Sequence, residues 1–146
     1  MKKSDLVAQA QGIISLMDSL SKDVDMFRQR EAEAKGKAER QADSIQELMT
    51  KKIYEIASMP DMKDNTIDPR TGKADDDWAK IITQIRLQED EEFQAAARVA
   101  EQARTEYEKA VALSRSYSER LGTCRSQAIL LSSLLRYLAG DEELAQ

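Results

Sequence analysis

The sequence predicts an all-α protein, folded as a long antiparallel two-helix coiled-coil hairpin. Two segments carry apolar residues at alternating intervals of three and four positions, which is the spacing of a coiled-coil seam. Neither segment contains proline, and neither shows the two-residue alternation of a β-strand. Both prolines of the 146-residue chain, Pro60 and Pro69, fall in the short stretch between the two segments. We therefore expect one helical domain over residues 1–146.

The first helix is expected over about residues 4–58. Ser4 can cap its first turn through the side-chain hydroxyl, and Pro60 cannot continue a helix. The first part of its seam has the spacing 4-3-4-3-4-3 and is made of Leu6, Ala10, Ile13, Met17, Leu20, Val24 and Phe27. Its middle is rich in alanine, and its last part drifts by about one position, as in a coiled-coil stutter.

A loop is expected at about residues 59–74. It contains the segment 68–72, in which Pro69 fixes φ at the second position of a turn and Gly72 permits a positive φ. A loop of this length allows the second helix to fold back antiparallel to the first.

The second helix is expected over about residues 75–139, followed by a short acidic tail at 140–146. Asp75 is a suitable N-cap, and the aspartates behind it favour the positive end of the helix dipole. The seam is made of Phe93, Ala96, Ala100, Ala103, Tyr107, Ala110, Ser114, Tyr117, Leu121, Cys124, Ala128, Leu131, Leu135 and Leu138. The spacing slips once near Glu89. A break near Gly122 would fold the last segment back and turn the hairpin into a helical bundle.

The register of the hairpin can be predicted from its loop. If the two helix ends meet across the loop, Phe27 lies opposite residues 107–109, and Leu6 lies opposite about Leu130. The second helix then overhangs the first by about eight residues. This overhang, at 130–138, is the most apolar segment of the chain.

The overhang is the candidate interaction site, since a contiguous exposed apolar patch usually marks an interface. The expected contact residues are Leu130, Leu131, Leu134, Leu135, Tyr137 and Leu138. Burial within the chain is the alternative, if the helix breaks near Gly122. Cys124 lies on the seam and is expected to be a small buried apolar residue, with an inter-chain disulfide as the alternative in an oxidising compartment.

The composition excludes several classes of function. Without histidine and with one cysteine, the chain has no Ser-His-Asp triad, no His-ligated zinc site and no internal disulfide. The net charge of −5 argues against nucleic-acid binding, and the longest apolar runs are too short for a membrane span. The carboxylates at 75–77 and 89–92 are expected to cap helices or face solvent. We expect no cofactor, no metal and no small-molecule substrate.

These features predict a non-enzymatic structural or interaction protein. In the first hypothesis, copies self-associate as a homo-oligomer through coiled-coil faces and the leucine-rich end of the second helix, in an assembly or filament. In the alternative, the protein is a small helical adaptor, chaperone or inhibitor, of the kind related to phages or secretion systems, that binds a larger protein partner. The first residues do not form a cleavable signal peptide, so the expected location is the cytoplasm, with export without such a signal as the alternative.

Overall fold

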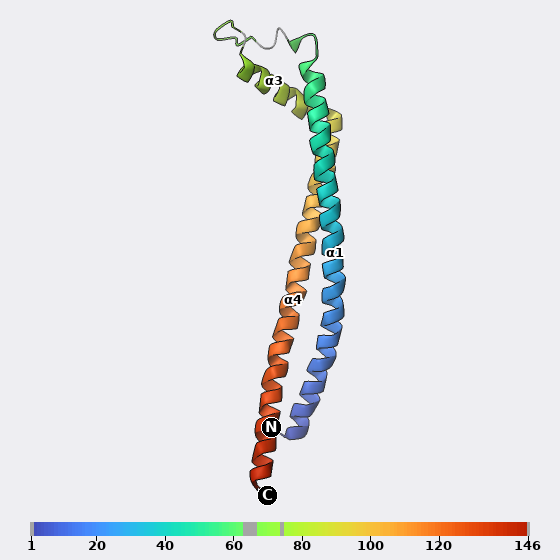
Figure 1. Cartoon of the computed structure of the whole chain (residues 1–146), viewed down its shortest axis with the longest axis vertical. Coiled ribbons are helices and arrows are strands. Elements are labelled where there is room, and N and C mark those ends of the chain that lie inside the picture. Colours follow the sequence, from blue (N-terminus) through green and yellow to red (C-terminus); the bar gives the residue numbers. More distant parts are fainter. Residues whose placement is uncertain (1, 63–66, 74, 146) are drawn as a thin grey trace. The chain divides into compact units, whose positions relative to one another are not determined.

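The computed structural model describes residues 2–62, 67–73 and 75–145 (Figure 1). The described elements are helix α1 at Lys3–Ala57, helix α3 at Asp76–Glu89 and helix α4 at Glu91–Ala145. The two long helices α1 and α4 confirm the all-α class and the helical hairpin. We expected a single domain, and the packing divides into two compact units. Unit 1 comprises Met1–Glu33 with Glu108–Gln146, and unit 2 comprises Ala34–Tyr107.

Unit 1 pairs a segment of α1 with a segment of α4, and its core lies on the predicted seam. Leu20, Val24, Leu121 and Cys124 form the buried cluster, against which Ile13, Met17 and Tyr117 pack. The rings of Phe27 and Tyr117 stack with their centroids 4.4 Å apart. Burial of these positions is what alternating three- and four-residue spacing produces when two helices pair along one stripe.

The register of unit 1 differs from the predicted one. Phe27 lies against Tyr117, eight to ten residues further along α4 than the predicted positions 107–109. Leu16 of α1 lines the same groove as Leu130, whereas the predicted register places Leu6 opposite about Leu130. The predicted overhang is therefore wrong, since α1 runs alongside the leucine-rich end of α4.

Unit 2 contains the physical reason for this shift. The end of α1 packs against α3 as far as the last turn of α3, because Ile56 and Leu87 share one buried cluster. Arg86, near the end of α3, also pairs with Asp61 just after α1, at 2.6 Å. Helix α3 is thus part of the connection between the long helices. The last turns of α1 lie at the α3–α4 corner, which begins at Asp90.

The predicted helix at 75–139 is two helices, which are separated at Asp90. The backbone of Asp90 is extended, with φ −71° and ψ 119°, and its N–H donates to the Leu87 carbonyl at the end of α3. Its carboxylate accepts a 2.9 Å hydrogen bond from the N–H of Phe93, which caps α4. The slip predicted near Glu89 thus corresponds to a break with a cap, and not to a local unwinding of one helix.

Helix α4 has no break near Gly122 and does not end at Gly140. It continues to Ala145, so residues 140–145 of the predicted tail are helical. A glycine that caps a helix C-terminus adopts a positive φ, and among the described glycines only Gly72 does so, at 66°. With helical dihedrals at the other glycines, the alternative of a folded-back last segment is excluded.

The predicted turn and cap before α3 are confirmed. The carboxylate of Asp68 accepts a 2.8 Å hydrogen bond from the N–H of Arg70, and the N–H of Gly72 donates to the Asp68 carbonyl at 2.8 Å. The Arg70 N–H holds the pKa of the Asp68 carboxyl below its usual range. Asp75 caps α3, because its carboxylate accepts a hydrogen bond from the N–H of Asp77 at 2.9 Å.

Candidate interaction surface

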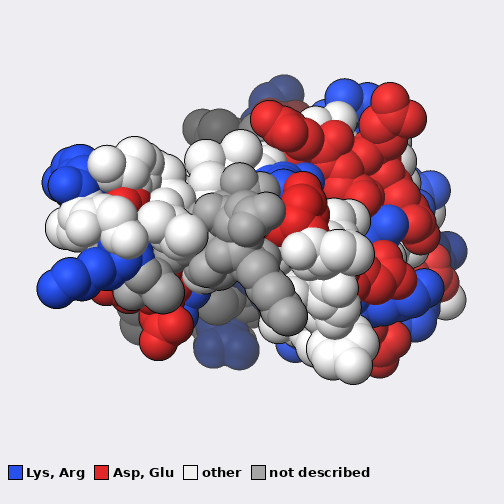
Figure 2. Space-filling view, turned by 90° about the horizontal axis from the view of Figure 1, so that it is seen from above, with Lys and Arg blue, Asp and Glu red and all other residues white. Residues whose placement is uncertain are grey.

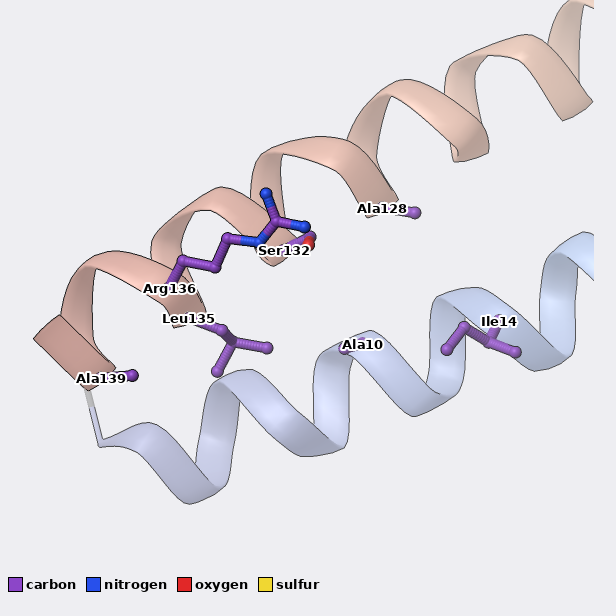
Figure 3. A pocket seen from close by; sticks show the side chains of 7 residues that line it. All are labelled: Ala10, Ile14, Ala128, Ser132, Leu135, Arg136 and Ala139. Atoms are coloured by element: carbon purple, nitrogen blue, oxygen red, sulfur yellow. The ribbon is translucent and has the colours of Figure 1, made fainter.

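The predicted contact residues divide between the seam of unit 1 and one of its exposed sides. Leu131 is buried, and Leu135 and Leu138 are half-buried. Leu135 points from α4 toward α1 (Figure 3). These three leucines therefore contribute to the packing of α1 on α4 and are less accessible than Leu130, Leu134 and Tyr137.

Leu130, Leu134 and Tyr137 lie on an exposed side of unit 1 that we call the leucine face, together with Leu16 of α1. Leu130 is 61% exposed, Leu134 42% and Tyr137 68%. Their spacing of four and three residues places them on successive turns of one side of α4. Leu16 and Leu130 line the same groove, which has a volume of about 410 Å³. Gly12 also lines this groove and has no side chain to fill it. The leucine face is thus an apolar strip with a groove along it.

A second exposed apolar side was not predicted from the sequence. Ile14 of α1 and Ile129 of α4, 56% and 68% exposed, line two neighbouring grooves that share Ala128, Ser132 and Arg136, and we call this side the isoleucine face. Figure 3 shows the groove beside Ile14, which is lined by Ala10, Ile14, Ala128, Ser132, Leu135, Arg136 and Ala139. The sequence contained a signal, because each isoleucine directly follows a seam residue. A two-helix seam makes no use of these positions, so they were overlooked.

The leucines of the leucine face and the two isoleucines of the isoleucine face lie in segments of unit 1 that carry no charge. Residues 6–17 of α1 and 126–135 of α4 include no Asp, Glu, Lys or Arg, although such residues make up 34% of the chain. Charged residues follow at the borders, with Asp18 on α1 and Arg125 and Arg136 on α4. Depletion of charge is typical of the buried centre of protein–protein interfaces.

Cys124 belongs to the core of unit 1. Its thiol is free, and the residue is 6% exposed in the cluster with Leu20 and Val24. An inter-chain disulfide would require this side chain to leave the core, so the packing favours the small buried apolar role.

Charged side chains gather at the α3–α4 corner of unit 2. Lys52 of α1 pairs with Asp90 at 3.2 Å and with Glu92 at 2.8 Å. These two carboxylates raise the pKa of Lys52, with Glu92 the larger influence. The Phe93 N–H and then Lys52 lower the pKa of Asp90. Figure 2, which looks onto the loop end, also shows carboxylates gathered on one side of that view. The paired charges at the corner stabilise the break between α3 and α4.

The described residues do not bring together a metal site or a membrane span. Within residues 2–62, 67–73 and 75–145, no group of three His, Cys, Asp or Glu side chains could hold an ion. None of the described helices is long and apolar enough to cross a membrane. No protein-family model matches the chain, and comparisons with curated proteins and with solved structures find no match either.

Proposed function

We propose that the protein is a non-enzymatic structural subunit whose copies self-associate through the leucine face of unit 1. The observation that carries this proposal is the exposure of Leu130, Leu134 and Tyr137 on successive turns of α4, next to Leu16 of α1. Large apolar side chains that are scattered singly need no explanation, but a contiguous strip of them marks a contact surface.

The physical driving force would be burial of this strip in a helix-to-helix contact. Burying a whole leucine side chain contributes about 1.5–3 kcal/mol. The exposed fractions of Leu130 and Leu134, 61% and 42%, together amount to about one whole leucine. In a symmetric contact each copy contributes this amount, so the two leucines would supply about 3–6 kcal/mol to a dimer.

The titratable groups support a role without catalysis. A carboxylic acid that donates a proton at neutral pH needs a raised pKa. Among the described carboxyl groups, those of Asp61, Asp68 and Asp90 have a shifted pKa, and in each the pKa is lowered. Arg86 lowers the pKa of Asp61, the Arg70 N–H that of Asp68, and the Phe93 N–H that of Asp90. The sequence also offers no histidine as a general base.

Light scattering over a concentration series tests the proposal. The wild-type mass should rise above the chain mass of 16.5 kDa as the concentration increases. Leu130→Gln with Leu134→Gln should move this transition at least about a hundredfold higher in concentration, the equivalent of about 3 kcal/mol. Far-UV circular dichroism should show unchanged helicity, since both side chains are exposed.

A matched control is available on α3. Ile81 and Ile85 are also four residues apart and are 49% and 48% exposed. Ile81→Gln with Ile85→Gln removes a similar apolar area outside unit 1 and should leave the mass transition unchanged. A wild type that stays at 16.5 kDa at every concentration would overturn the proposal. The adaptor, chaperone or inhibitor hypothesis would then take its place.

A further inference from the structure

We infer that the isoleucine face of unit 1 is a second self-association surface, and that its occupant is the isoleucine face of another copy of this chain. The inference rests on the proposed function and extends it from one contact to two. It predicts that assembly continues beyond a dimer.

The two faces lie on different sides of the seam. Ile14 and Leu16 are two positions apart on α1, which separates them by about 200° around the helix axis. A copy that covers Leu16 therefore leaves Ile14 exposed, while on α4 the consecutive residues Ile129 and Leu130 are about 100° apart. The groove beside Ile14 has a floor of small side chains, so another helix could approach closely.

The borders of the isoleucine face carry opposite charges on the two helices. On α1, Asp18 lies one turn after Ile14, and helical periodicity places Asp25 on the same side two turns further. On α4, Arg125 and Arg136 line the groove that contains Ile129. Figure 3 shows the Arg136 side chain running back along α4 toward Ser132 at the edge of the groove. Lys22 lies between the two aspartates on this side, so α1 presents two acidic groups and one basic group, and α4 presents two basic groups.

These four charged side chains have no ion-pair partner among the described residues. Asp18, Asp25, Arg125 and Arg136 form no ion pair with another residue of the described ranges, and all four are exposed. These positions carry a net charge of −1 on α1, where Lys22 offsets one aspartate, and of +2 on α4, so the two sides of the face are complementary in net charge. When α1 of one copy lies along α4 of another, an aspartate can meet an arginine in each of the two equivalent helix pairs, and the isoleucines are buried between them.

Two opposite contacts have a consequence for the size of the assembly. The leucine face alone would give a closed dimer, because a symmetric contact uses the same surface on both copies. A second symmetric contact on the other side of unit 1 joins these dimers to one another. The wild type should therefore exceed twice the chain mass of 16.5 kDa at high concentration.

Charge reversal tests this contact without touching an apolar side chain. Asp18→Lys with Asp25→Lys makes the face basic on both helices, and Arg125→Glu with Arg136→Glu gives it a net negative charge on both helices, with Lys22 unchanged. Each variant alone should weaken the second contact at least about tenfold and stop at a dimer, because like charges then face each other. An equal mixture of the two variants should recover the wild-type mass, because a basic face can bind an acidic one.

The mixture also provides the control for folding, since only folded variants can restore each other's assembly. Charge variants that keep the wild-type mass, or a mixture that stays dimeric, would overturn the inference. The proposed function can fail on its own. Leu130→Gln with Leu134→Gln would then leave the mass unchanged, while the charge variants lower it. That result would make the isoleucine face a contact and the leucine face none. A wild type that is monomeric at every concentration overturns both.

Discussion

Replacement of Phe27 and Tyr117 by leucine, singly and together, tests the register of unit 1. The two rings are 4.4 Å apart between centroids and tilted by 32°. Aromatic pairs in such contact are worth about 0.5–1.5 kcal/mol beyond the apolar area that they bury. We therefore expect the two effects on the free energy of unfolding to be coupled by about 1 kcal/mol. Under the register with Phe27 opposite residues 107–109, this coupling would be absent.

The double-mutant cycle separates the ring pair from its surroundings. Arg30 lies 5.5 Å from the centre of the Phe27 ring, and Arg120 lies 5.0 Å from that of Tyr117. Each single substitution also removes one of these cation–π contacts, which are worth about 0.5–1 kcal/mol at exposed sites. Each cation–π contact is lost in one of the single variants and equally in the double variant. The two contacts therefore cancel in the coupling energy.

Urea unfolding followed by circular dichroism measures the four free energies. The cycle is best made at a protein concentration at which light scattering finds a monomer, so that self-association adds nothing to the stability. A control cycle pairs Phe27→Leu with Leu113→Ala, because Leu113 is exposed one turn before Tyr117 on α4. We expect its coupling to stay within about 0.3 kcal/mol of zero. A Phe27–Tyr117 coupling equally close to zero would refute the register.

Two further predictions concern the corner of unit 2 and the thiol of unit 1. Because the pKa of Asp90 is lowered by the Phe93 N–H and by Lys52, its contribution to stability is present at neutral pH and is lost as the pH falls below about 4. The Asp90→Asn variant keeps a capping oxygen, but this side chain cannot titrate. The free energy of unfolding of the variant should therefore fall less steeply than that of the wild type between about pH 4 and pH 2. Equal slopes would contradict this. Because Cys124 is buried, a maleimide should label the native protein at least about tenfold more slowly than the urea-unfolded protein. A reductant should not alter the mass. Rapid labelling of the native protein would show that the thiol is accessible.

The helical elements could be predicted because their signals are local. The N-cap Asp75, the turn around Asp68 and the seam with Leu20 and Val24 each depend on neighbours within a few residues. The ends of the helices were harder. Gly140 has the residue type of a C-terminal cap, but α4 continues through it, because a glycine also tolerates helical dihedrals.

The candidate site was predicted only in part, for a geometric reason. The sequence indicated that the leucine-rich end of α4 matters, but it could not separate Leu131, which packs on α1, from Leu130, which does not. That separation depends on the register, and the register depends on where the connection between the long helices begins and ends. The isoleucine face was overlooked because flanking positions gain importance only when the two helices are seen side by side.

The amino-acid sequence by itself determined that this chain is helical, that it turns back once through a proline-containing connection, and which stripe of each long helix forms the seam. Periodicity and proline placement act over a few residues, so they are visible in one dimension. Only the tertiary structure decided the pairing of Phe27 with Tyr117, the corner at Asp90 and the exposure of the two apolar faces of unit 1. A seam that repeats every seven residues allows several registers of similar apolar burial, and long-range contacts such as that of Ile56 with Leu87 select one of them.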